Sequence, residues 1–172
     1  MQRETEVLVI GAGAAGLMCA ATAGAQGRQV MVVDHAAKPG KKILVSGGGR
    51  CNFTNMDVDH SHYLCENPHF VKSALARYTQ WDFLAMINRY KIEYHEREHG
   101  RLFCDRSAKL IVNMLLGECD DAGVKLELNT EIKSVNRQGD RFHIKTGLDD
   151  IFCDHLVIAT GGLSFDHLGA TP

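Results

Sequence analysis

The sequence predicts an α/β fold of the Rossmann type, with a parallel sheet and a small antiparallel β segment. An apolar strand over 7–10 runs directly into a Gly-x-Gly-x-x-Gly turn over 11–16. An alanine-rich helix over 14–26 follows, and a second apolar strand over 29–33 ends in Asp34. Strand, glycine turn, helix and acid-ended strand, in this order, form the fingerprint of a dinucleotide-binding βαβ unit.

Each position of the turn has a separate physical task. Gly11 permits a tight bend, Gly13 lets the backbone approach a pyrophosphate, and Gly16 allows the helix to pack closely on the sheet. The helix N-terminus offers unpaired N–H groups and the positive end of its dipole to phosphates. Asp34 follows at close to the roughly 20 residues expected for the acid that accepts ribose hydroxyls. The pattern therefore predicts a nucleotide site.

Length and composition are those of one ordinary globular domain. The 172 residues, 45% of them hydrophobic and 23% charged, are enough to bury a proper core. The formal net charge of −2 gives no electrostatic argument for a nucleic-acid or anionic-membrane partner. No apolar stretch approaches the roughly 20 residues of a membrane span, and the first strand leaves no room for a signal peptide. We therefore expect a cytoplasmic protein with no nucleic-acid and no membrane partner.

The six cysteines and nine histidines show no metal or disulfide pattern. No two cysteines form a Cys-x-x-Cys pair, and Cys19, Cys119 and Cys153 fall within apolar helix or strand patterns. Buried free thiols are the favoured interpretation. His60 and His62 have no companion ligand at metal spacing, which favours a solvated loop. The sequence thus predicts no metal site.

A basic, glycine-rich stretch follows the second strand. Three glycines, Gly47–Gly49, stand between Ser46 and Arg50, and Lys42 precedes them. Consecutive glycines do not stabilise helices or strands, because each costs backbone entropy. They suit a loop whose N–H groups form a concave anion site, with Lys42 and Arg50 supplying positive charge. A flexible surface connector is the alternative, but the basic, Asn-rich flank favours a binding loop.

Periodicity predicts the remaining elements. Apolar residues at helical spacing predict three helices, over 67–78, 81–90 and 107–121. The aromatic stripe that includes Trp81 is interpreted as core. Alternating apolar residues predict strands near 124–128 and 142–144, and a last apolar strand runs into the small-residue turn Ala159–Gly162. That turn is a second place where a backbone could meet a ligand.

Three segments together resemble a known family. They are the turn 11–16 with Asp34, the run Lys42–Asn55, and Ala159–Ser164 with Leu168–Pro172. The chain resembles the two-dinucleotide-binding flavoproteins, and more closely the bacterial aminoacetone-oxidase-type family of NAD(P)/FAD-dependent oxidoreductases. The likeness runs through the whole chain, and its Ser-Gly-Gly-Gly-Arg-Cys-Asn run is highly specific.

The resemblance implies FAD as cofactor, NADH or NADPH as reductant and a small molecule as substrate. The glycine turn would hold the pyrophosphate, Asp34 the adenosine ribose, and residues 46–52 the flavin side. Ile132 would lie near the adenine, and 159–161 would close over the nucleotide. The implied cofactor contacts are Gly11, Ala12, Gly13, Ala14, Ala15, Gly16, Asp34, His35, Lys42, Ser46, Gly47, Gly48, Gly49, Arg50, Cys51, Asn52, Ile132, Ala159, Thr160, Gly161 and Gly162. Asp34 is a modest departure, because many flavoproteins have Glu there.

Length is the larger departure from the family. Its members are about twice as long, as is usual for multi-domain enzymes. The resemblance therefore predicts that residues 1–172 are the N-terminal portion of an FAD-binding domain. The substrate domain and a C-terminal segment that completes the FAD site would be absent from this chain.

Three functions remain open at this point. The first is the FAD-binding portion of a flavin-dependent oxidoreductase whose substrate is unknown, and the second is a catalytically inert nucleotide-binding remnant. A plain NAD-binding dehydrogenase domain ranks lower, since it would not need the triple-glycine loop. An RNA-modifying flavoprotein would be a further relative, but the net charge of −2 gives it no electrostatic footprint.

No side chain is assigned a catalytic role. Cys51 beside Arg50 could have a lowered thiol pKa if its loop is electropositive, but a structural thiol at the flavin edge is the favoured interpretation. His35 is interpreted as a wall beside the adenine rather than a base.

Overall fold

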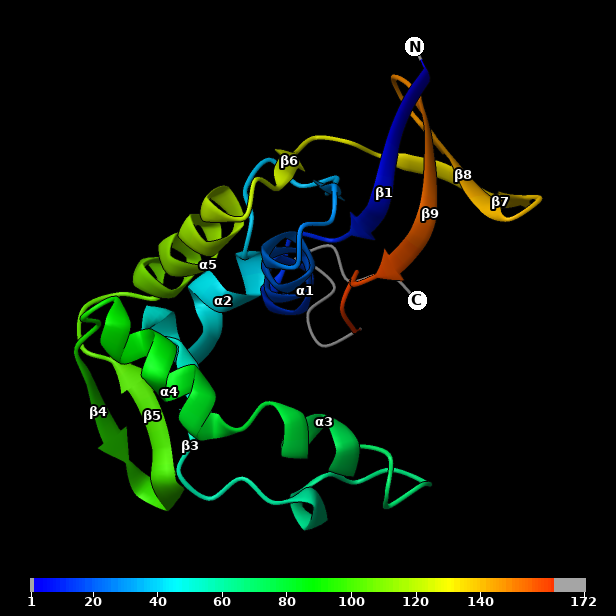
Figure 1. The fold of residues 1–172 in the computed structure, drawn as a ribbon. Helices are drawn as coiled ribbons and strands as arrows, with labels where there is room; N and C mark the ends of the chain where they lie inside the picture. The colour runs from blue at the N-terminus through cyan, green and yellow to red at the C-terminus, as the bar shows by residue number, and fades with distance from the viewer. Residues whose placement is uncertain (1, 163–172) are drawn as a thin grey trace. The chain divides into compact units, whose positions relative to one another are not determined.

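The computed structural model describes residues 2–162 and divides into two compact units (Figure 1). Unit 1 combines the chain up to Ile43 with the chain from Val112 onward, and unit 2 is Leu44–Ile111. Residues 163–172, which carry the last part of the family resemblance, lie outside the described residues. That residues 1–172 act as one FAD-binding domain stays a prediction.

Unit 1 is built on a six-stranded mixed sheet in the order β6-β2-β1-β9-β8-β7. Its strands are β1 (Gln2–Ile10), β2 (Val30–Val33), β6 (Lys125–Glu127), β7 (Ile132–Gln138), β8 (Arg141–Thr146) and β9 (Asp150–Ile158). Strands β6, β2, β1 and β9 are parallel to their neighbours, whereas β8 pairs antiparallel with both β9 and β7. The predicted parallel sheet with an antiparallel segment is thus confirmed.

The core of unit 1 lies on this sheet. In the β1–β2 register, Val7 faces Val30 and Ile10 faces Val33, and every residue of β2 is buried. Such continuous burial is expected of parallel strands covered on both faces. One cluster extends from these strands into the antiparallel part and contains Leu8, Ile10, Met31, Val33, Ile144, Ile151 and Cys153.

Helix α1 (Ala14–Ala25) packs against the sheet through small residues, as its sequence predicts. Its C-cap is Gln26, and Gly27 follows with φ of +82°, the left-handed conformation common just after a helix. Helix α5 (Lys109–Asp121) contributes Cys119, whose Sγ donates to the Leu17 carbonyl oxygen at 3.3 Å. Among residues 2–162, no helix is long and apolar enough to cross a membrane.

Unit 2 contains a three-stranded antiparallel sheet that the sequence analysis did not predict. Its order is β3-β5-β4, formed by β3 (Asn52–Asn55), β5 (Arg101–Cys104) and β4 (Tyr94–Arg97). The other elements of this unit are the helices α3 (Lys72–Arg77) and α4 (Gln80–Arg89) and the 3₁₀ turns η1 (Ser46–Gly49), η2 (His60–His62) and η3 (Glu98–Gly100). Helix α2 (Lys41–Val45) spans the boundary between the units.

An aromatic cluster packs α4 on this sheet. The Phe53 ring centroid lies 6.0 Å from that of Phe83 and 5.6 Å from that of Tyr94. Leu84 and Ile87 of α4 are buried as well. The interpretation of the aromatic stripe as core is nevertheless wrong for Trp81, whose exposed fraction is 54%.

The first helix of unit 2 is shorter than predicted. It begins at Lys72 with Val71 as its N-cap, and not near Asn67. The Asn67 side chain instead accepts the His69 N–H at 3.0 Å, which closes a local Asx turn. The Phe70 N–H also donates to the Asn67 carbonyl oxygen at 3.0 Å, so a turn precedes the helix.

Candidate cofactor site

Backbone contacts explain two of the three glycines in the first turn. Gly11 has φ of +114°, and a Cβ there would lie 2.3 Å from the carbonyl oxygen of Ala159. A Cβ on Gly16 would lie 1.9 Å from the carbonyl oxygen of Gly11. The Ala159 N–H also donates to the Ile10 carbonyl at 2.8 Å. The turn, the start of α1 and the end of β9 are therefore in direct contact, with no room for side chains.

Gly13 lies in open space instead. It is the N-cap of α1, and nothing lies within 4 Å of where its Cβ would be. No side chain caps the helix, and the first N–H groups of any helix lack partners within it. Ala14 and Ala15 beside it are exposed. The N-terminus of α1 is thus an open cradle of N–H donors that fits a phosphate group.

Asp34 makes two contacts that the sequence did not reveal. Its Oδ2 accepts the Ala12 N–H at 2.6 Å, and its Oδ1 accepts the Ala36 N–H at 2.8 Å. The side chain is 15% exposed. Each carboxylate oxygen can accept a further hydrogen bond, so the predicted contact with a ribose remains compatible with these bonds. Asp34 therefore also fixes the glycine turn.

His35 follows Asp34 directly, whereas Ile132 lies at the start of β7. The His35 ring is 55% exposed, with Nδ1 3.6 Å from Asp34 Oδ1. Ile132 opens β7 and packs against the unit 1 core, and nearby Thr130 donates its N–H to the Asp34 carbonyl at 2.8 Å. The predicted adenine contacts of His35 and Ile132 stay predictions.

Lys42 is tied to the turn that follows β9. Its Nζ donates to the carbonyl oxygen of Gly162, and Gly161 in the same turn has φ of +85°. The Gly40 N–H donates to the Ala12 carbonyl at 2.8 Å. Unit 1 thus brings together the glycine turn, Asp34, Lys42 and the predicted residues Ala159–Gly162.

The triple-glycine loop lies in unit 2 and is held by many contacts. Its three glycines have φ of 57°, 67° and 84°, the left-handed region that favours glycine. A Cβ on Gly47 would lie 2.6 Å from the Phe103 ring. Arg50 accepts the Cys104 N–H at 2.9 Å, and Gly49 accepts the Ala108 N–H at 2.8 Å. These bonds argue against a flexible connector. The flavin contact of Ser46–Asn52 stays a prediction.

The Cys51 thiol is not activated. Cys51 is buried, and burial raises the pKa of its thiol above the ordinary value. The pKa of buried Cys104 is raised to about 11 for the same reason. The alternative of a lowered Cys51 pKa is therefore wrong, and the favoured structural thiol is compatible with this burial.

A charged network beside the triple-glycine loop was missed by the sequence analysis. His95 Nδ1 lies 2.6 Å from Asp105 Oδ1, and Arg97 Nε donates to His95 Nε2 at 3.0 Å. Arg50 donates to the Asp105 carbonyl oxygen. The pairing of β4 with β5 brings His95 opposite Phe103, close to Asp105. No motif in the sequence marks this network, because strand register and not spacing creates it.

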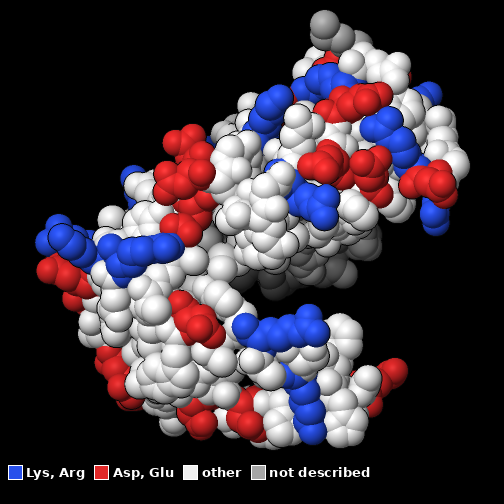
Figure 2. Space-filling view, in the orientation of Figure 1, with Lys and Arg blue, Asp and Glu red and all other residues white. Residues whose placement is uncertain are grey.

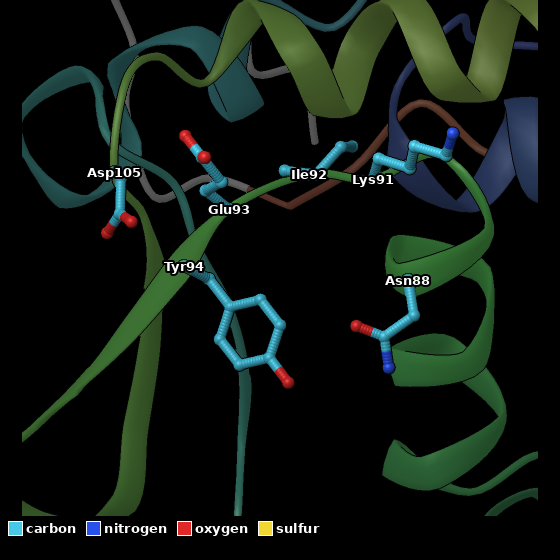
Figure 3. A pocket seen from close by; sticks show the side chains of 6 residues that line it. All are labelled: Asn88, Lys91, Ile92, Glu93, Tyr94 and Asp105. Carbon is cyan, nitrogen blue, oxygen red and sulfur yellow. The ribbon is translucent and has the colours of Figure 1, made fainter.

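Unit 2 also has an open cavity of about 550 Å³. It is lined by Asn88, Lys91, Ile92, Glu93, Tyr94 and Asp105. In Figure 3 the side chains of Tyr94 and Asn88 point toward one another across it. None of the lining residues is a predicted cofactor contact. Within residues 2–162, no group of three or more His, Cys, Asp or Glu side chains is arranged to hold a metal ion.

Comparison with known proteins gives the family. Residues 5–172 match the family described as "HI0933-like protein Rossmann domain". The chain belongs to the HI0933-like family. This confirms the resemblance drawn from the glycine turn and the triple-glycine loop, and FAD is the cofactor that this family implies.

Two curated members of similar sequence have the same name. The chain is 52% identical to the ribosomal RNA dihydrouridine synthase of Escherichia coli (strain K12), over 97% of the chain and 42% of that protein. It is also 52% identical to the ribosomal RNA dihydrouridine synthase of Haemophilus influenzae (strain Rd), over 100% of the chain and 44% of that protein. The chain therefore spans less than half the length of these relatives.

A solved structure confirms the fold at greater distance. The 3-ketosteroid-Δ4-(5α)-dehydrogenase of Rhodococcus jostii superposes with a TM-score of 0.66 over 93% of the chain and 46% of that protein. The identity is 12%, so this similarity supports the fold and nothing finer.

Proposed function

We propose that this chain is the FAD-binding part of a flavin-dependent reductase that converts uridine to dihydrouridine in ribosomal RNA. The observation that carries the cofactor assignment is the cradle at α1, where Gly13 leaves open space beside unpaired N–H groups. The substrate assignment rests on the 52% identity to two ribosomal RNA dihydrouridine synthases.

Each part of unit 1 would make a defined contact with FAD. The N-terminus of α1 would bind the pyrophosphate, because its N–H groups and dipole favour anions. The Asp34 carboxylate would accept hydroxyl hydrogens of the ribose while it keeps the Ala12 N–H. Ile132 would lie beside the adenine, and Ala159–Gly162 would close over the nucleotide. In unit 2, Ser46–Asn52 would contact the flavin end.

The proposed reaction adds a hydride and a proton across one carbon–carbon double bond of the uracil ring. When bound, FAD would supply the redox chemistry, with NADH or NADPH as the reductant that is oxidised. The residues of this chain would bind and orient the cofactor.

This proposal differs from the expectation that no nucleic acid is involved. That expectation rested on the net charge of −2. The names of the two relatives argue against it, and a whole-chain charge does not describe any one surface. Lys, Arg and aromatic side chains that gather locally can bind RNA on a nearly neutral protein.

The test is a reconstitution with FAD of the whole reductase to which this chain is proposed to belong. The loaded protein is incubated with ribosomal RNA lacking dihydrouridine, together with NADH or NADPH, and nucleosides are analysed by mass spectrometry. We expect dihydrouridine only when FAD and a reductant are both present, and none with the Gly13→Ala variant. Bound, reducible FAD with unmodified RNA would refute the substrate assignment.

A second candidate is the inert nucleotide-binding remnant. Its supporting observation is that the chain spans only 42% to 44% of the two relatives. Reconstitution of the chain alone with FAD separates the two candidates, because a remnant would not retain FAD after desalting.

A further inference from the structure

The segment 60–81 of unit 2 exposes aromatic side chains to solvent and also contains basic residues. We propose that it binds single-stranded RNA by stacking bases on its exposed aromatic side chains while its basic residues contact phosphates. This inference rests on the proposed function, because it places the RNA substrate of that reaction on one surface of the chain. The segment comprises η2, helix α3 and the start of α4 (Figure 1).

Four aromatic side chains in this segment are exposed to solvent. The exposed fractions are 45% for Tyr63, 75% for Phe70, 40% for Tyr78 and 54% for Trp81. All residues from 61 to 70 are exposed. Exposed large apolar side chains that gather in one region mark an interaction site more often than isolated ones do.

Packing of unit 2 does not account for these aromatic residues. The rings that hold α4 on the sheet are Phe53, Phe83 and Tyr94, and the buried residues of α4 are Leu84 and Ile87. The core of this unit is thus formed by other side chains. Tyr63, Phe70 and Trp81 are not among those side chains, so their exposed rings are available to a partner.

The charges in the segment are complementary to RNA. Lys72 and Arg77 are the only Lys or Arg residues between 51 and 88, and both belong to α3. Figure 2 shows blue side chains over this helix. Among the described residues, neither side chain forms an ion pair, and Glu66 is the only carboxylate between 60 and 81. These cations are therefore free to contact phosphates.

Exposed aromatic side chains together with basic side chains are the combination that binds single-stranded nucleic acids. Unstacked bases stack on aromatic rings, while basic side chains contact the backbone. A protein partner would use the same apolar surface but would not need the two unpaired cations. The named substrate of the two relatives, ribosomal RNA, further favours RNA over protein.

The test uses Trp81, the only tryptophan of the chain. The FAD-loaded chain is titrated with a single-stranded RNA of about 15 nucleotides, a length that matches the site sizes of such surfaces. We expect saturable quenching of Trp81 fluorescence that weakens with salt. Phe70→Ala should weaken binding about tenfold, as the loss of one stacked base does. Lys72→Gln with Arg77→Gln should lower the salt dependence by about two released ions.

Matched controls come from unit 1. Leu148→Ala removes another exposed apolar side chain, and Lys145→Gln removes another exposed cation. Both variants should bind RNA as the unchanged chain does, with the affinity read from the fluorescence of Trp81. Circular dichroism checks that each variant keeps its fold.

Three results would overturn the inference. If RNA binds but the Phe70 and α3 variants match their controls, RNA contacts another surface and the proposed function survives. If FAD binds but RNA does not, segment 60–81 is not an RNA-binding surface, and the RNA-modification test decides the proposed function separately. If Trp81 emission is that of a buried indole and RNA leaves it unchanged, the segment packs against protein instead.

Discussion

The three glycines of the first turn differ in how much space their neighbours leave for a side chain, and substitution by alanine distinguishes them. A Cβ at Gly16 would lie 1.9 Å from a backbone oxygen, whereas a Cβ at Gly13 would contact nothing. Gly16→Ala should therefore lower the free energy of unfolding by about 2–3 kcal/mol or more. Gly13→Ala should change it by less than about 1 kcal/mol. Urea unfolding followed by circular dichroism measures both, and equal losses would contradict the geometry.

The cysteines should fall into classes of different reactivity. Cys65 is exposed, whereas Cys51, Cys104, Cys119 and Cys153 are buried. Burial raises the pKa of both Cys104 and Cys119 to about 11, so little thiolate forms near neutral pH. We expect Cys65 to be alkylated first at about pH 8, and the buried group to react only in denaturant.

Peptide mapping by mass spectrometry assigns each alkylated cysteine, and Cys65→Ser provides the control. Rapid labelling of Cys51 in the folded chain would contradict its burial and would restore the interpretation as a reactive thiol.

At the scale of single residues, the fingerprint predicted the positions of the glycines but not the hydrogen bonds of Asp34. The glycine positions follow from the motif because backbone geometry alone demands them. The bonds from Ala12 and Ala36 to Asp34 could not be predicted, since spacing does not say which N–H a carboxylate meets. Trp81 was placed in the core because helical periodicity marks a face without saying whether a neighbour covers it.

Helix α4 provides a test at the scale of one element. Its N-terminus is a capping box, in which the Thr79 hydroxyl accepts the Asp82 N–H and the Asp82 carboxylate accepts from Thr79. These bonds lower the pKa of Asp82 from its ordinary 3.8. The group therefore stabilises the fold above pH 3.8, and this contribution is lost as the pH falls toward the lower folded value.

We expect Asp82→Ala to destabilise the chain at neutral pH, with a difference from the unchanged chain that shrinks below pH 3.8. Urea titrations at a series of pH values measure this difference. A difference that stayed constant down to strongly acid pH would show that the carboxylate charge has no part in the cap.

The sequence predicted the helices and strands that have long apolar patterns, but it did not predict the short, polar strands. Strands β1 and β2 and helices α1 and α5 have continuous or periodic apolar residues, and all four were expected. Strand β4 has four residues, two of them exposed, which is too short and too polar for alternation to show. The other strands of this sheet, β3 and β5, are as short, so the sheet of unit 2 depends on long-range pairing that periodicity does not detect.

The division into two units was equally invisible in the sequence. The chain leaves unit 1 after Ile43, forms unit 2, and returns at Val112. No change in composition marks either boundary, and α2 and α5 run through them. Only the pairing of distant strands, such as β2 with β6, reveals that unit 1 is discontinuous.

Exposed apolar residues predict association of the isolated chain. Besides segment 60–81, Leu148 is 80% exposed and Ile158 at the end of β9 is 62% exposed. Such surface favours contacts between molecules. We expect the sedimentation coefficient to rise with protein concentration, and less so in a Leu148→Ser, Phe70→Ser variant. A monomer of unchanged coefficient over the whole concentration range would contradict this expectation.

The measurement that tests the account most directly is the visible absorption spectrum of the chain after incubation with excess FAD and desalting. We expect the unchanged chain to retain flavin bands and Gly13→Ala to lose them with its fold intact, because a Cβ at that position would enter the space assigned to the pyrophosphate. A colourless unchanged chain, or a Gly13→Ala variant that retains FAD equally well, would contradict the cofactor cradle at α1.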